Sequence, residues 1–317
     1  MAATPRSQAV TAAEAVRRSL EGAGRTDWRS VAFQAVLVLL LVLTLGILAW
    51  LLAVVFVNGT PVLLERGTEF LTSPLASQPD RAGVGQAIQG SLMLMAFVAL
   101  LSFPLGIGAA VYLEEYAADT AFTRFVNTVV RNLAGVPSIV YGLLGLAVFV
   151  VALGDVVGPG PASGRSLLAG GLTMAILVLP IVIITSGEAL RAVPGSIREA
   201  AFGVGATRWE VVRSHVLPYA APGIFTGTIL SMARAFGETA PLILVGAVIG
   251  GFNVRYDSVL EQLQGRYTAL PTTVYDWARK PASFEGNVYA AIVVLIAVLL
   301  VVNALAIYLR NRFERRW

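Results

Sequence analysis

Cysteine is absent from this 317-residue sequence, and histidine and lysine occur once each, as His215 and Lys280. Without cysteine the chain can form neither a disulfide nor a thiolate metal site, and a lone histidine argues against zinc. The sequence also lacks G-x-x-x-x-G-K-[ST], the signature of nucleotide-binding P-loops. We therefore expect no catalytic residue, no metal site and no bound cofactor in this chain, so that any ATP chemistry belongs to a partner.

Charged residues are also scarce, and this decides the class of protein. They make up 13% of the chain against about 25% in soluble proteins, while hydrophobic residues reach 56%. Since the apolar residues come in long runs, we predict an all-α membrane protein. The net charge of +4 comes mainly from arginines clustered at loops and chain ends. Membrane topology therefore explains the basic balance better than nucleic-acid binding does.

Six apolar stretches are long enough to cross a bilayer, which takes about 20 helical residues. We predict six transmembrane helices at about 32–57, 86–113, 125–153, 166–187, 219–250 and 285–309. Residues 1–30 are expected to form an N-terminal tail, and residues 31–317 the transmembrane domain.

Arginine is distributed unequally between the two sides that six spans would create. The two tails, the turn 114–124 and the loop 194–218 hold thirteen arginines, or fourteen with Arg191 just before the loop, whereas the opposite loops hold six arginines and Lys280. Basic residues flanking spans favour the cytoplasmic side. We therefore expect both termini and the loop 194–218 to lie in the cytoplasm.

The loop 194–218, PGSIREAAFGVGATRWEVVRSHVLP, is a polar island between the fourth and fifth spans. Ser196 with Glu199, and Thr207 with Glu210, each have the spacing of a helix capping box. The loop is therefore predicted to form two short helices, with a glycine hinge between them and Pro218 closing the second. Each helix carries a small apolar stripe at helical spacing: Ile197, Ala200, Ala201 and Val204 on the first, and Trp209, Val212 and Val216 on the second. Such stripes are too small to form a core, which indicates a docking element.

The order Glu199-Ala200-Ala201, Gly205, Leu217-Pro218 resembles the EAA loop of ABC-type importer permeases, although His215 stands where those proteins carry an apolar residue. The resemblance implies the ABC type I importer permease fold. It also implies that this loop contacts a cytoplasmic ATPase and couples it to transport. The coupling residues it suggests are Ser196, Glu199, Ala200, Ala201, Gly205, Leu217 and Pro218.

Two opposite charges, Arg234 and Glu238, lie four residues apart inside the fifth apolar stretch. A charge at the bilayer centre costs about 2.5–3.5 kcal/mol on insertion scales, so the pair should face protein or water. Two interpretations remain open. The pair either ties helices together, or Arg234 lines a path for an oxyanion, for which the planar guanidinium is well suited.

Four further segments together resemble the PstA-type permeases of bacterial phosphate importers: GVPSIVYGLLG, EALRAVP, RAFGETAPLI and ALPTTVYDWARKP. This resemblance implies the permease subunit of an ATP-driven phosphate importer, not an enzyme by itself. The implied location is the bacterial inner membrane, and the implied substrate path contains Arg234, Glu238 and Arg191. The implied partners are a PstC-like second permease, two PstB-like ATPase subunits that use ATP and Mg²⁺, a PstS-like phosphate-binding protein, inorganic phosphate and membrane lipid.

Three alternatives compete with this interpretation. One is an importer of the same architecture for sulfate or molybdate, and another is a channel or secondary transporter that needs no ATPase. The docking loop also has the outline of a DNA-binding helix-turn-helix. That third class is disfavoured, because apolar spans begin at both ends of the loop and leave no free recognition helix.

Overall fold

The computed structural model describes residues 28–247 and 258–313, and every regular element in these ranges is helical. The α-helices are α2 (Trp28–Thr72), α3 (Gly85–Val111), α4 (Ala121–Ala134), α5 (Ser138–Gly145), α6 (Gly154–Val157), α7 (Leu167–Arg191), α8 (Gly195–Gly203), α9 (Arg208–Val211), α10 (Leu217–Phe236), α11 (Ala240–Leu244), α12 (Val259–Gln264), α13 (Leu270–Trp277) and α14 (Glu285–Phe313). Short π- or 3₁₀-helical segments are η1 (Tyr112–Tyr116), η2 (Leu146–Ala152), η3 (Gly160–Ala162), η4 (Val212–Val216) and η5 (Ala282–Phe284).

Within these ranges, five helical stretches are long and apolar enough to cross a membrane: Trp28–Thr72, Gly85–Tyr116, Leu167–Arg191, Arg208–Phe236 and Ala282–Arg312. A sixth span is obtained if the bent pair Ala121–Ala134 and Ser138–Ala152 is counted as one. The all-α membrane class predicted from composition is therefore confirmed.

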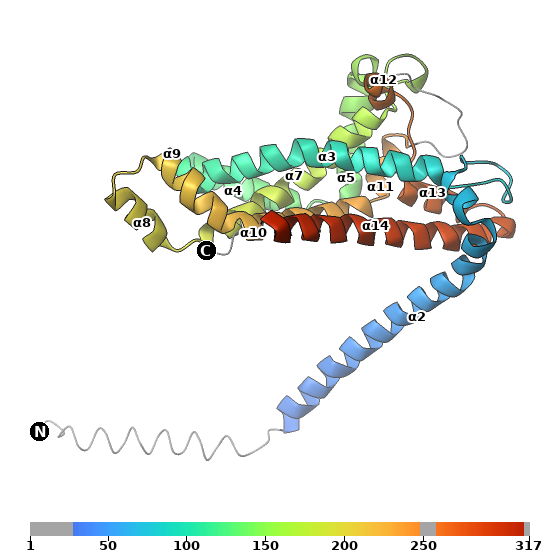
Figure 1. The fold of residues 1–317 in the computed structure, drawn as a ribbon, viewed down its shortest axis with the longest axis horizontal. Coiled ribbons are helices and arrows are strands. Elements are labelled where there is room, and N and C mark those ends of the chain that lie inside the picture. Colours follow the sequence, from blue (N-terminus) through green and yellow to red (C-terminus); the bar gives the residue numbers. More distant parts are fainter. Residues whose placement is uncertain (1–27, 248–257, 314–317) are drawn as a thin grey trace, which may run out of the picture. The chain divides into compact units, whose positions relative to one another are not determined.

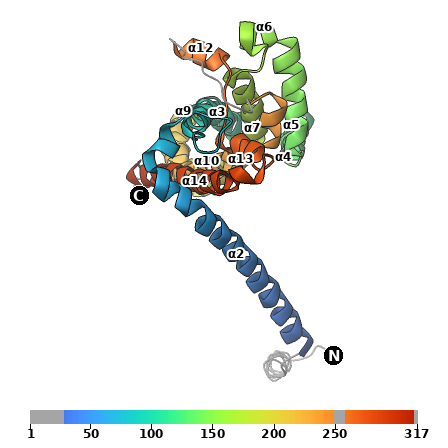
Figure 2. The same ribbon diagram turned by 90° about the vertical axis from the view of Figure 1, so that its right-hand side faces the viewer.

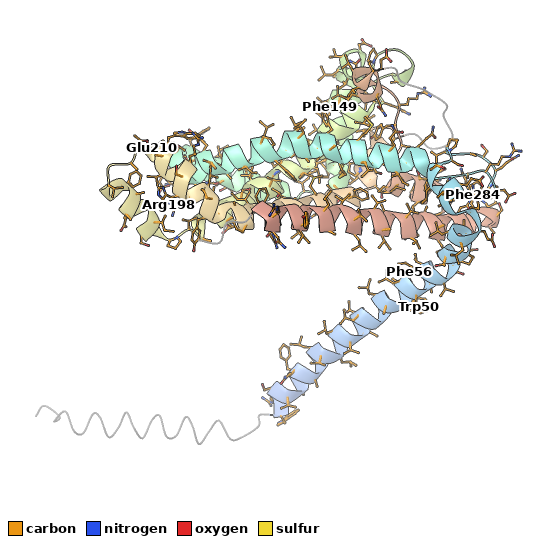
Figure 3. The ribbon with its side chains drawn as sticks, in the orientation of Figure 1. Trp50, Phe56, Phe149, Arg198, Glu210 and Phe284 are labelled. Atoms are coloured by element: carbon orange, nitrogen blue, oxygen red, sulfur yellow. The ribbon has the colours of Figure 1, made fainter. Side chains whose placement is uncertain are left out.

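The chain divides into two units, Met1–Val54 and Val55–Trp317. The described part of the first unit is the beginning of α2. Its large side chains, such as Leu37 and Leu41, are exposed. Trp50 is exposed as well (Figure 3). A helix that is hydrophobic all round is typical of a segment surrounded by lipid. The helix is longer than the predicted span 32–57 and continues to Thr72 across a kink at Gly67, so residues 58–72, which lie between the first two predicted spans, are helical.

Four long helices of the second unit, α3, α7, α10 and α14, run side by side (Figure 1), and Figure 2 looks along them. Helix α7 is the most buried of the spans. Gly106 of α3 faces Val182 of α7, and Gly227 of α10 faces Thr185 of α7. Small residues at these crossings let the helices approach closely, as is common in membrane bundles. Helices α8 and α9 lie at one end of this bundle, called the α8 end below, and α13 lies at the other.

The predicted third span, 125–153, is not one continuous helix. Helices α4 and α5 meet at an angle of 101°. The break falls at Val136 and Pro137, because proline has no backbone N–H to donate and disfavours helical geometry at the residue before it. The Tyr141 hydroxyl donates a 2.8 Å hydrogen bond to the Leu133 carbonyl and so holds the two arms together across the bend.

Candidate functional site

The docking loop contains two short helices around a glycine turn, as its sequence predicts. They are α8 and α9, and Gly205 between them has a φ of 86°. This left-handed conformation is accessible to glycine at little cost and is unfavourable for β-branched residues. The turn therefore depends on glycine at this position.

Only one of the two predicted capping boxes is present. The Thr207 amide donates to Glu210 Oε2 at 2.8 Å, and Thr207 Oγ1 accepts from the Glu210 amide at 3.4 Å. The Ser196–Glu199 box is a wrong prediction. Helix α8 begins at Gly195, with Pro194 as a cap that makes no side-chain hydrogen bond, so Ser196 already lies inside the first turn.

The prediction that Pro218 closes the second helix is also wrong. Helix α9 continues through η4 into α10 without a break, and Leu217 and Pro218 are the first two residues of α10. Proline is tolerated within this continuous helix because a local π-helical adjustment, here η4 directly before α10, helps to satisfy the backbone groups that proline leaves free. The second short helix is therefore the beginning of the fifth span, and the docking loop is joined directly to it.

The predicted apolar stripe of α8 does not face one way. Ala201 is buried and Ile197 is half-buried against the bundle, whereas Ala200 and Val204 are exposed, Val204 to 87%. The outward apolar surface of the loop consists of Phe202, Val204 and Trp209, which we call the docking surface. Phe202 was not singled out in the sequence, because it lies between the residues of the helical stripe rather than on it.

Two arginine–glutamate pairs lie where the loop meets the bundle, and of their four residues only Arg191 was singled out in the sequence as a candidate site residue. Arg198 of α8 donates to Glu115 Oε1 at 2.7 Å, and Arg191 of α7 donates to Glu114 through two nitrogens, at 2.6 and 2.8 Å. Both glutamates lie in η1, directly after α3. Together with Arg208, these four residues line a recess of about 670 Å³ beside α8. The sequence did contain a signal for these contacts. Two adjacent glutamates end one apolar span, and the loop 194–218 is rich in arginine.

The three residues suggested for a substrate path are not brought together. Ala189 faces Gly223 and Thr185 faces Gly227, so α7 and α10 run in opposite directions. By the same register Arg234 lies level with residue 178, thirteen positions from Arg191. At 1.5 Å per residue the two arginines are separated by about 20 Å along α7. Arg191 therefore belongs to the α8 end, with Glu114, and not to the neighbourhood of Arg234.

Arg234 and Glu238 meet at a break in the fifth span rather than on one helical face. Helix α10 ends at Phe236, and α11 starts at Ala240. Arg234 Nε lies 3.7 Å from Glu238 Oε1, and the two side chains are 60% and 18% exposed. The last part of the predicted span, 248–250, lies outside the described residues. A guanidinium in the last turn of a helix is favoured by the partial negative charge there, and this one remains accessible on the surface of the chain.

Comparison with known proteins identifies the family. Residues 102–317 match the binding-protein-dependent transport system inner membrane components. The chain belongs to this family. The match covers the docking loop, the broken fifth span and both glutamates of η1. The chain is thus a multi-pass inner-membrane component of a transport system.

Individual relatives are similar over most of their length. The chain is 34% identical over 273 residues to the phosphate transport system permease protein PstA 1 of Mycobacterium tuberculosis (strain H37Rv). The aligned region covers 85% of this chain and 83% of the relative. It is 31% identical to PstA of Yersinia pestis over 88% and 90% of the two chains. It is also 30% identical to the phosphate transport system permease protein PstC of Mesorhizobium japonicum, over 87% and 88%.

Solved structures share the fold. A chain of the bacterial alginate ABC transporter, in complex with an alginate-bound periplasmic protein, superimposes with a TM-score of 0.63 and 16% identity. The match covers 92% of this chain and 99% of that one. A chain of the inward-facing MetNI methionine ABC transporter gives a TM-score of 0.53, with 74% and 95% covered. The ABC importer permease fold implied by the EAA resemblance is confirmed.

Proposed function

We propose that this protein is the transmembrane permease subunit of an ATP-driven phosphate importer. The observation that carries the proposal is the similarity to PstA proteins over 85–88% of the chain. The accessible arginine at the break of the fifth span supports it independently, since a planar guanidinium matches the oxygens of phosphate in a bidentate manner.

In this proposal the α8 end faces the cytoplasm, and both termini lie on that side. The excess of arginine in the loop 194–218 and in the tails supports this orientation. The end of α14 supports it too. Arg310 Nη1 donates to Thr226 Oγ1 at 2.8 Å, and Thr226 belongs to the half of α10 that adjoins the loop.

The docking surface of Phe202, Val204 and Trp209 fits a groove on an ATPase subunit. Aromatic side chains are over-represented among the residues that dominate binding energy at interfaces. The remaining partners are a PstC-like second permease, a second ATPase copy and an extracytoplasmic phosphate-binding protein. ATP and Mg²⁺ belong to the PstB-like ATPase subunits, and this chain binds no cofactor of its own.

For the substrate path we propose Arg234 and Glu238, the charged pair at the break. Arg234 contacts the anion, and Glu238 orients the guanidinium and weakens its hold, so that phosphate is passed on rather than trapped. Arg191 is proposed only as a residue at the inner mouth, because its guanidinium already holds Glu114.

Reconstitution in liposomes tests the proposal. The chain is combined with the second permease, the ATPase and the binding protein, and uptake of labelled phosphate, sulfate and molybdate is measured with and without ATP. ATP-dependent uptake of phosphate alone is the expected result. Preferential uptake of sulfate or molybdate assigns the importer to another oxyanion. Uptake without ATP or ATPase contradicts the importer and favours a channel or secondary transporter.

A further inference from the structure

One guanidinium connects the docking loop to the ends of two transmembrane helices. Arg198 lies on α8 (Figure 3) and donates to Glu115 at the end of α3, through Nη2 at 2.7 Å and Nε at 3.4 Å. The same side chain donates to the carbonyls of Leu190 and Val193, at 2.9 and 2.8 Å. Leu190 belongs to the last turn of α7 and Val193 follows that helix. Arg198 therefore holds α3, α7 and α8 at a single point.

The bonds to Leu190 and Val193 supply hydrogen-bond donors to backbone carbonyls at the end of α7. The last four carbonyls of a helix have no intrahelical donor, and a charged side chain that satisfies them stabilises the helix end. Here the Leu190 carbonyl accepts from Arg198 of the docking helix at 2.9 Å, in addition to a longer bond of 3.3 Å from the Val193 amide. The Glu115 side chain is 9% exposed and that of Arg198 is 24% exposed, so water competes little for these bonds. Breaking such a pair from one side leaves a charge without its partner in a largely buried place.

Neighbouring ion pairs link the end of α7 to η1 and to α4, but they do not involve α8. Arg191 joins the end of α7 to Glu114, and it also lies 3.2 Å from Glu188. Glu188 in turn lies 3.4 Å from Arg131 of α4. Within the described residues, Arg198 is the member of this set that belongs to the docking helix. The backbone connects α8 to α7 through residues 192–194 and to α10 through Gly205, whereas the ion pair of Arg198 with Glu115 connects α8 to the end of α3.

We infer that Arg198 is a positioning residue for coupling. It transmits a movement of the docking helix α8 to the ends of α3 and α7, and Glu115 is its counterpart. The inference rests on the proposed function, because it assumes that an ATPase moves α8. A lysine at position 198 keeps the charge, but its single ammonium cannot reproduce the spread of donors that reaches a carboxylate and two carbonyls together.

The test uses the complete reconstituted complex with the variants Arg198→Lys and Glu115→Gln. The readout is phosphate imported per ATP hydrolysed, measured beside retention of the ATPase in a pull-down. Coupling between sites typically corresponds to factors of about 5–150, and we expect this ratio to fall about tenfold while the ATPase remains bound. Arg124→Lys is the matched control. It changes another arginine–carboxylate pair, with Asp119 at 2.7 Å, that is exposed and does not touch α8.

Each outcome has one meaning. A lower ratio in both variants, with an unchanged control, supports the inference. An unchanged ratio overturns it, including the case in which uptake and hydrolysis fall in proportion, since that pattern identifies Arg198 as merely structural. If Arg198→Lys fails to assemble, Glu115→Gln decides alone, because it keeps the shape of the side chain. The wild-type complex is measured first: lack of phosphate uptake there contradicts the proposed function, not the role of Arg198.

Discussion

Arg234 and Glu238 face each other across the end of α10, with Nε and Oε1 3.7 Å apart. This separation is an ion pair but exceeds the length of a good hydrogen bond. The carboxylate is largely covered while the guanidinium is 60% exposed. The arginine therefore retains donors that an anion can use, which distinguishes this pair from a closed helix-to-helix clamp.

Arg234→Lys should abolish most phosphate uptake even though the charge is kept. The ammonium is a compact point charge without the planar fork, and it loses its proton more readily when desolvated. Uptake in proteoliposomes and basal ATP hydrolysis are measured together. We expect uptake to fall about 100-fold, which corresponds to roughly 2.7 kcal/mol at 1.36 kcal/mol per factor of ten, with hydrolysis retained. Full uptake in the lysine variant would contradict a fork-dependent contact.

The double variant Arg234→Gln with Glu238→Gln separates the path interpretation from the structural one. It removes both charges together, so neither charge is left without its partner. On the path interpretation the complex assembles and hydrolyses ATP, but phosphate uptake is lost. Assembly with normal uptake would identify the pair as a helix clamp. Assembly is checked by co-purification of the ATPase.

The docking surface should account for much of the affinity for the ATPase. Trp209→Ala is expected to weaken binding by about 2 kcal/mol, or roughly 30-fold, as is typical when a central aromatic of an interface is truncated. Affinity is measured with the purified ATPase subunit. Phe225→Ala is the control, since Phe225 is an exposed aromatic of α10 outside the loop. Equal losses in both variants would show that truncating an exposed aromatic acts indirectly.

The parts of this fold that follow local rules could be predicted from sequence. The apolar stretches correspond to long helices because a bilayer requires each segment to satisfy its own backbone hydrogen bonds. The turn at Gly205 and the Thr207–Glu210 box depend on residues a few positions apart, and both are present. The right-angled break after α4 was missed, although Pro137 marks it, because proline within a span is often tolerated.

The contacts that join distant segments could not be predicted in the same way. Arg198 and Glu115 are 83 positions apart, and nothing in either segment states that they meet. The end of α10 between Arg234 and Glu238 was also not predicted, since an i, i+4 spacing is equally consistent with a continuous helix. The direction of the α8 stripe depends on where the bundle lies, which a helical pattern alone does not specify.

Gly205→Val should uncouple hydrolysis from transport. Valine at a φ of 86° is strained by about 1–3 kcal/mol, so the turn between α8 and α9 is expected to rearrange. Phosphate uptake per ATP is the measurement. Gly195→Val is the control, because Gly195 lies in the same loop with open space around it and an ordinary φ. Normal coupling in Gly205→Val would remove the turn from the coupling mechanism.

Gly227→Ala should destabilise the bundle at the crossing of α7 and α10. A Cβ atom at this position lies 2.5 Å from both Cβ and Oγ1 of Thr185, so one helix must shift. Overpacking of this kind costs about 1–3 kcal/mol. The midpoint of thermal unfolding in detergent is the measurement, and we expect it to fall.

Two companion variants determine whether this contact is the cause. Gly108→Ala places a methyl group on α3 where no atom lies within 4 Å, so we expect no loss, or a gain of about 0.5–1 kcal/mol from the higher helix propensity of alanine. Thr185→Gly removes the atoms that Gly227→Ala would strike. The alanine substitution should therefore cost less in that background than in the wild type, because its steric partner is absent. An equal cost in both backgrounds would mean that α7 and α10 do not meet at these residues. It would also contradict the alignment of the two helices from which the separation of about 20 Å between Arg191 and Arg234 is derived.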